Sequence, residues 1–96
     1  MTSAERAYER RPGLVAANLG EELAVLDMAS GSYLGFNATA AHVWRLLDQP
    51  RTLKALCEAM MQEFDIDADR CRSELRELLD QMLAAGLIQT RHDDAA

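Results

Sequence analysis

The sequence predicts an α+β domain in which a three-stranded antiparallel sheet is followed by three helices. Over residues 14–36 the apolar residues form short runs broken by polar or small residues, as in half-buried strands. From residue 38 onward they recur every three or four positions, which is the period of a helix. The change falls at Asn37, a favoured N-cap residue, so we expect the sheet and the first helix to meet without a loop.

The expected strands are short and are separated by residues that favour tight turns. They span residues 14–19, 22–27 and 32–36. Gly20 lies in the first turn, and the run Ala-Ser-Gly at 29–31 lies in the second.

The last strand carries the least ordinary pattern. Alternation places Tyr33 and Gly35 on one face and Leu34 and Phe36 on the other. If Leu34 and Phe36 face the core, Tyr33 is an exposed aromatic residue beside a gap at Gly35. A glycine inside a strand indicates either a bulge or the close approach of another backbone, and the sequence leaves both interpretations open.

Three helices are expected, each with one apolar stripe that faces a single core with the sheet. They span residues 38–47, 53–64 and 68–85. The predicted N-caps are Asn37, Thr52 and Asp67, and Gly86 is the predicted stop of the third helix.

The composition limits the classes of protein to consider. Ninety-six residues make one domain, which we place at 13–89, between flexible tails at 1–12 and 90–96. The net charge of −6 argues against nucleic-acid binding, and no apolar run is long enough for a membrane span. We therefore expect a cytoplasmic protein with reduced thiols.

The residues show no catalytic or metal-binding constellation. His42 and His92 have none of the paired spacings to Cys57 and Cys71 that a zinc site needs. Both cysteines fall on apolar helical stripes, where a free thiol packs as a small hydrophobic group. We expect no enzymatic activity, no metal and no cofactor.

Two features exceed what a core requires. Arg72 and Arg76 lie one turn apart on the flank of the third helix, and Leu79 continues the same edge. They are either solvated and paired with neighbours such as Asp80 or Glu77, or they suit an acidic and partly apolar peptide. The second feature is the edge strand at 32–36, because an edge strand beside a helix makes a groove for an extended peptide.

At this point the chain resembles a known family, the PqqD-like domain or RiPP recognition element. The residues that carry the resemblance are Leu26-Asp27, the run at 31–37 (Gly-Ser-Tyr-Leu-Gly-Phe-Asn), Ala40-Ala41 and the run at 43–47 (Val-Trp-Arg-Leu-Leu). The segments at 51–67 and 83–88 are similar to the family as well, so the resemblance spans about residues 14–88.

The resemblance implies a winged helix-turn-helix-like fold and a non-catalytic peptide chaperone. Family members bind the leader of a ribosomally made precursor peptide as an added strand and deliver it to a maturation enzyme. That enzyme is a leader peptidase in lasso-peptide pathways or a radical SAM protein in others. The peptide-binding residues it implies here are Ser32, Tyr33, Leu34, Gly35 and Phe36 on the strand, and Arg72, Leu75, Arg76 and Leu79 on the third helix. The segments at 33–37 (Tyr-Leu-Gly-Phe-Asn) and 44–47 (Trp-Arg-Leu-Leu) look closer to those of the stand-alone, lasso-type members of the family.

Two other interpretations remain. A winged-helix DNA-binding regulator would need a basic recognition helix, whereas residues 53–64 offer only Lys54 against Glu58 and Glu63. A dimeric structural module could pair two copies through the strand at 32–36, and homodimerisation through this free edge is also open to a peptide-binding protein.

Overall fold

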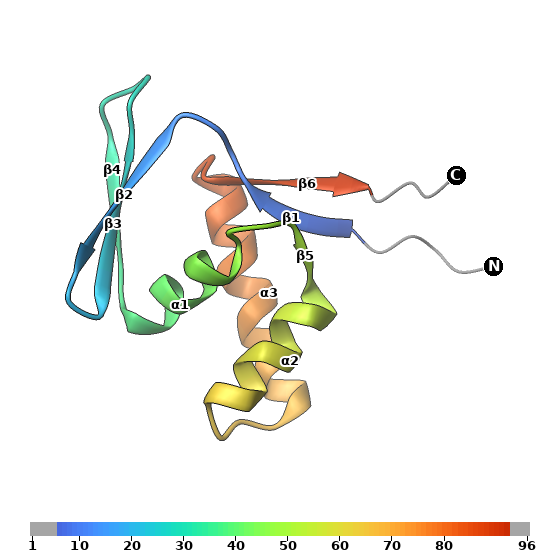
Figure 1. Ribbon diagram of the computed structural model, residues 1–96. Coiled ribbons are helices and arrows are strands. Elements are labelled where there is room, and N and C mark those ends of the chain that lie inside the picture. The colour runs from blue at the N-terminus through green and yellow to red at the C-terminus, as the bar shows by residue number, and fades with distance from the viewer. Residues whose placement is uncertain (1–5, 93–96) are drawn as a thin grey trace.

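The computed structural model describes residues 6–92, which form two small sheets and three helices. In chain order the elements are β1 (Arg6–Arg10), β2 (Leu14–Leu19), β3 (Glu22–Asp27), β4 (Tyr33–Phe36), α1 (Ala38–Leu46), β5 (Arg51–Thr52), α2 (Leu53–Glu63), α3 (Ala68–Ala84) and β6 (Ile88–His92). One sheet stands at one side of the molecule, the strands β1 and β6 lie on the other, and the helices lie between and below them (Figure 1).

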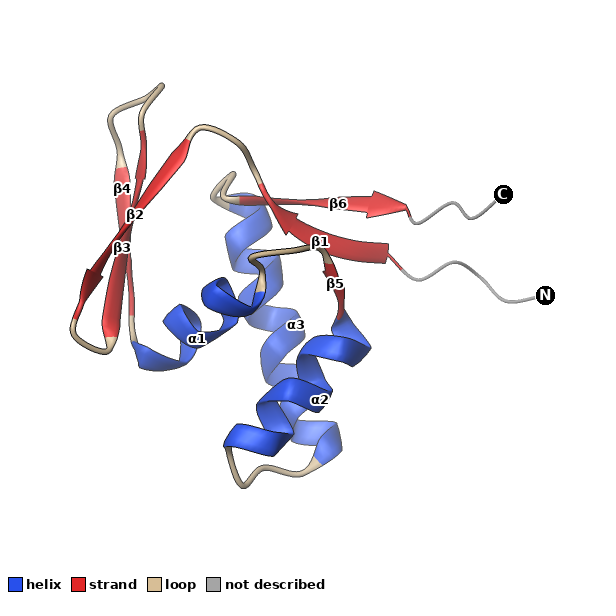
Figure 2. Cartoon of the chain, in the orientation of Figure 1, coloured by secondary structure: helices blue, strands red, loops and turns tan. Residues whose placement is uncertain are grey.

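The predicted sheet and the predicted fold class are confirmed. Strands β2, β3 and β4 pair antiparallel in that order, so β4 is an edge strand. The three strands lie together at one side of the molecule (Figure 2). The register sets Leu23 opposite Phe36 and Val25 opposite Leu34, on the face that meets the helices. The opposite face carries Tyr33, which is 74% exposed.

The second sheet was not predicted, and the expectation of flexible tails is wrong for its residues. β1 pairs antiparallel with β5 on one side and with β6 on the other. Only Ala7 of β1 is fully buried, so the strand has no apolar alternation to mark it in the sequence. The strand forms because it pairs with β5 and β6, which lie far along the chain. The rest of the expected tails, residues 1–5 and 93–96, lies outside the described residues.

The three predicted N-caps are confirmed. Each cap side chain accepts a hydrogen bond from the backbone N–H three residues on: Asn37 from Ala40 at 2.9 Å, Thr52 from Ala55 at 3.1 Å and Asp67 from Arg70 at 2.8 Å. Helix α3 ends as predicted at Gly86, whose φ of 78° suits a residue without Cβ. The N–H of Leu87 donates to the carbonyl of Met82 at 3.0 Å, which closes the helix end.

One core joins the first sheet to all three helices. Its side chains come from the inner face of the sheet, from α1, α2 and α3, and from the start of β6. Cys57 and Cys71 both belong to this core, as predicted, and both thiols are free.

Trp44 of α1 connects the two sheets. Its ring lies 5.9 Å from that of Phe36, centroid to centroid, at the end of β4. On another side the Arg10 guanidinium of β1 lies 4.6 Å from the centroid of the same ring and donates to the Trp44 carbonyl at 2.6 and 3.1 Å. Burial lowers the pKa of Arg10, and the charge of Asp48 partly offsets this, but an arginine stays protonated.

Replacing Arg10 with alanine should therefore destabilise the fold. The loss of a partly desolvated cation–π contact and of two charged hydrogen bonds should lower the free energy of unfolding by about 1–3 kcal/mol, measured by urea denaturation. The neighbouring Arg11 side chain is exposed and makes no such contact, so Arg11→Ala is the matched control. Equal losses in both variants would mean that Arg10 does not anchor β1.

Candidate functional site

The free side of β4 is the first part of the candidate site. Within residues 6–92, β4 pairs only with β3. The N–H of Asp27 donates to the carbonyl of Ser32 at 2.8 Å, which makes this pair a hydrogen-bonded one. Because bonded and non-bonded pairs alternate along an antiparallel ladder, the N–H and C=O groups of Tyr33 and Gly35 point to the free edge. Such groups are open to an additional strand.

Gly35 is not required by the fold itself. It pairs with Ala24 in an unbroken register, so the bulge interpretation is wrong. A Cβ built on Gly35 meets nothing within 4 Å, and its φ is not in the left-handed region. The approach of a backbone from outside the chain stays a prediction.

Two hollows lie beside α3 and the segment that follows it. The first, of about 170 Å³, lies between residues that include Ser32, Tyr33 and Leu34 and the segment of Ala85 and Leu87 beyond α3. Leu34 shares the inner face of the sheet, yet it remains 42% exposed because it lies beside this hollow.

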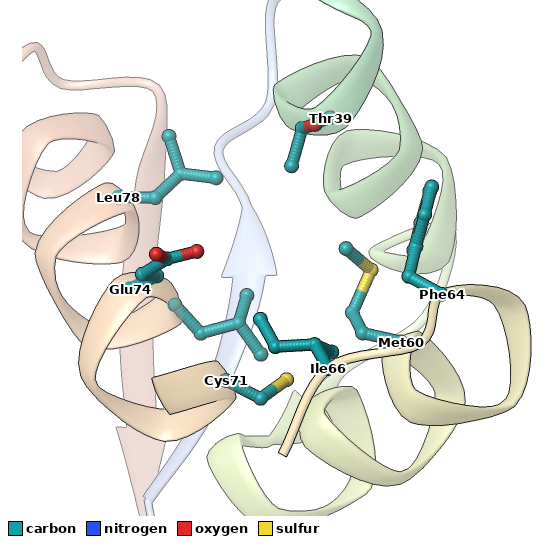
Figure 3. A pocket seen from close by; sticks show the side chains of 8 residues that line it. Thr39, Met60, Phe64, Ile66, Cys71, Glu74 and Leu78 are labelled. Atoms are coloured by element: carbon teal, nitrogen blue, oxygen red, sulfur yellow. The ribbon is translucent and has the colours of Figure 1, made fainter. Parts of the chain in front are cut away.

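The second hollow, of about 190 Å³, is predominantly apolar. Met60, Phe64 and Ile66 from the end of α2 and the following loop lie across from α3 (Figure 3). The α3 wall and the far rim are formed by Cys71, Glu74, Leu75, Leu78 and, from α1, Thr39. Glu74 is the one charged side chain in this lining, so the hollow suits an apolar side chain.

Both hollows use the same side of α3. Leu78 lines one and Ala85 lines the other, and seven residues of helix span about 10 Å. Leu34 at the start of β4 lies near Ala85, whereas Thr39, just past its end, lies near Leu78. The two hollows share no lining residue, and we refer to them together as the β4–α3 groove.

Of the predicted strand residues, Ser32, Tyr33 and Leu34 line the first hollow, whereas Gly35 and Phe36 line neither. Leu75 forms part of the second hollow and is only 3% exposed, and Leu79 is 0% exposed and lines neither hollow. Phe36 is likewise buried against Trp44, and its backbone groups point to Leu23 of β3 rather than to the free edge.

Arg72 and Arg76 lie elsewhere. At 100° per residue they project about half a turn away from Leu78 and Ala85, and both are exposed. They line a separate hollow beside β1, so the structure does not bring them together with Tyr33 and Gly35. Neither arginine forms an ion pair with another described residue, so the expected pairs with Glu77 and Asp80 are absent there.

Sequence reasoning missed other residues of α3 and its C-terminal end that line the two hollows. Glu74, Leu78 and Ala85 lie on the other flank of the same apolar stripe. The helical period shows that both flanks exist, but only the path of the chain decides which one faces the sheet. Phe64, just beyond the end of α2, is 44% exposed and lines the second hollow.

A family comparison bears on these residues. The model of the family described as Coenzyme PQQ synthesis protein D (PqqD) matches residues 22–88, which include β4, α3 and the whole groove between them. The chain belongs to the PqqD family. The predicted resemblance is thereby confirmed, although a family name does not assign this member to one pathway.

Two solved structures have the same fold as this PqqD-family chain. The first is described as TbiB1 in complex with the TbiA(beta) leader peptide, with a TM-score of 0.80 and 22% identity over 88% of this chain and 99% of that one. The second is described as lasso peptide synthetase B1 complexed with the leader peptide, with a TM-score of 0.73 and 23% identity over 85% of this chain and 96% of that one. A comparison with curated protein sequences finds no match.

The described part of this PqqD-family chain holds no group of three or more His, Cys, Asp or Glu side chains placed to bind a metal ion. Between residues 6 and 92, no helix has the length and apolarity to cross a membrane. Cys71 lines the groove, so its thiol is the nearest candidate nucleophile. Burial, and then the neighbouring Cys57, raises the pKa of this thiol to about 11, which leaves it protonated and unreactive near neutral pH.

Stability should consequently fall in alkaline solution. An unfolded thiol ionises at about pH 8.5, whereas the folded Cys71 keeps its proton, so unfolding releases protons and becomes easier as the pH rises above about 9. We expect Cys71 to resist iodoacetamide at pH 8 in the folded protein and to react in urea, as followed by mass spectrometry. The Cys71→Ser variant should lose this part of the pH dependence. Rapid alkylation of folded protein would contradict the burial.

Proposed function

We propose that this protein is a non-catalytic carrier that binds the leader of a ribosomally made precursor peptide and presents it to a maturation enzyme. The observation that carries the proposal is the free edge of β4. Its outward N–H and C=O groups at Tyr33 and Gly35 lie beside a groove whose far wall is α3. Backbone pairing supplies affinity for any extended peptide, and the hollows supply selection between peptides.

The alternation of an added strand explains how the groove would select. Side chains of the leader that point inward meet the hollow beside Leu34 and the apolar hollow beside Leu78. Side chains that point outward lie beside Tyr33, on the exposed face of the sheet. Inward-pointing side chains of an extended leader are spaced by multiples of about 7 Å, so two of them can serve as anchors, one for each hollow.

The lasso-peptide pathway is the one that we propose. Both solved structures with this fold are described as bound to a leader peptide, and one of them is described as a lasso peptide synthetase component. The partner enzyme is then a leader peptidase, with a radical SAM enzyme as the alternative. We place the carrier in the cytoplasm, which suits two free buried thiols.

The charge of α3 disfavours the DNA-binding alternative. Three arginines on this helix are accompanied by four acidic residues, Asp69, Glu74, Glu77 and Asp80. A recognition helix with no net positive charge lacks the usual electrostatic footprint for phosphates.

A proline at position 35 tests strand addition directly. Gly35→Pro removes one outward N–H without breaking a bond to β3, and an edge strand tolerates this change because Leu34 is already extended. We expect the affinity for a synthetic leader, encoded beside this gene, to fall about tenfold, since one hydrogen bond is lost and the ring hinders pairing. Gly35→Ala keeps the N–H and should bind as the wild type does.

Backbone amide shifts in NMR spectra provide the readout. Saturating leader should shift the resonances of Tyr33, Gly35 and Leu78 in the wild type. If the leader leaves these resonances unmoved while duplex DNA shifts them, the carrier function is wrong. Equal binding by the proline and alanine variants would show that the leader does not pair with β4.

The same edge is proposed to pair with a second copy when no leader is bound. An antiparallel pair centred on Leu34 sets Tyr33 opposite the partner's Gly35, and the outward backbone groups of both residues then bond to each other. The aromatic ring would lie over the glycine and fill the gap in the strand.

Self-association should therefore compete with the leader. We expect sedimentation equilibrium to detect dimers at high protein concentration and monomers after addition of saturating leader. Gly35→Pro should weaken the dimer as well. A dimer that persists with bound leader would place the contact on another surface.

A further inference from the structure

The hollow on the far side of α3 concentrates positive charge. It measures about 550 Å³ and is lined by Arg6 of β1, Lys54 of α2 and Arg72 and Arg76 of α3, with Asp80 as its one acidic residue. Tyr8 and Leu53 add apolar surface between the charges. We call this surface the cationic hollow.

Internal stability does not explain this arrangement. The chain has ten basic residues and a net charge of −6, yet four of the ten converge here. Other arginines are paired: Arg51 with Asp48, Arg70 with Glu74 and Arg91 with Glu9. None of the four cations of the hollow forms an ion pair with any residue between 6 and 92. Like charges held together repel one another, and Asp80 is the one acidic residue of the lining, so an added anionic group would be favoured here.

The cationic hollow is separate from the β4–α3 groove. Arg72 and Arg76 project from α3 about half a turn away from Leu78 and Ala85, which line the groove. The remaining lining comes from β1 and the start of α2 rather than from β4. A ligand in the hollow therefore need not displace a peptide from the groove.

The chemistry of the lining favours carboxylates on an extended segment. Arginine binds a carboxylate through two parallel hydrogen bonds, and cations on three elements can meet several carboxylates at once. A single small anion would gain little at exposed cations. Tyr8 and Leu53 can take an apolar side chain between the acidic ones. Nucleic acid is disfavoured, because Asp80 lies in the hollow and Glu58 and Asp69 border it beside Lys54 and Arg72.

We infer that the cationic hollow is a second binding site, for an acidic and partly apolar segment of a partner protein. The identity of this partner as the maturation enzyme rests on the proposed function. The enzyme would hold the carrier from one side of α3 while the leader occupies the other.

Charge reversal tests the site with a defined probe. The probe is a labelled peptide of alternating glutamate and leucine, and binding is followed by fluorescence anisotropy at low salt. We expect saturable binding that weakens as salt rises, and at least about a tenfold loss in the double variant Arg72→Glu, Arg76→Glu. The control Arg11→Glu, Arg45→Glu changes the net charge equally outside the hollow and should bind as the wild type does. Arg72→Gln, Arg76→Gln provides a milder second variant.

Several outcomes would overturn the inference. These are equal binding by the two charge-reversed variants, equal binding of a peptide with glutamine in place of glutamate, and displacement of the probe by duplex DNA or by inorganic phosphate. Displacement by saturating leader would also overturn it, because the two sites would then be one. Amide shifts at Lys54 and Arg76 with the probe, but none at Tyr33 or Gly35, support it. A leader that fails to shift Tyr33 and Gly35 refutes the carrier function alone and leaves the site in place.

Discussion

The indole ring of Trp44 contacts Phe36 of β4 at a centroid distance of 5.9 Å and the guanidinium of Arg10 of β1 at 4.6 Å. Trp44 is one of the buried side chains of the core that the two small sheets share with the helices. No backbone hydrogen bond joins one sheet to the other within residues 6–92. A chain of this size buries little apolar surface, so a few such contacts determine its shape. The position of the free edge of β4 against α3 depends on them.

Helix α3 has three different sides. One side, with Leu75, Leu79 and Met82, packs into the core and keeps the helix in place. The second forms the wall of the β4–α3 groove, and the third carries Arg72 and Arg76 into the cationic hollow. Because the core side is fixed, the two outer sides cannot both face β4. The arginines and the groove are therefore kept apart by the geometry of a single helix.

Local signals in the sequence predict most of the fold but only half of the candidate site. The caps Asn37, Thr52 and Asp67, the stop at Gly86 and the pairing of β4 follow from local rules, and all are present. Strand β1 escapes prediction because its stability comes from β6 and from Trp44, both distant in sequence. The placement of Arg72 and Arg76 away from β4 has the same origin: periodicity gives the sides of a helix, whereas tertiary contacts decide what each side meets.

Because β4 is short, its hydrogen bonds alone would not fix the position of a bound peptide along the strand. Only Tyr33 and Gly35 offer outward backbone groups, so a guest strand could shift by two residues and still make the same hydrogen bonds. Such a slip would move the rest of the peptide by about 7 Å relative to a docked enzyme. The hollows beside Leu34 and Leu78 would then fix the register of the bound peptide. The spacing between the anchoring side chains and the cleavage point, rather than the affinity of the edge, would set where the enzyme acts.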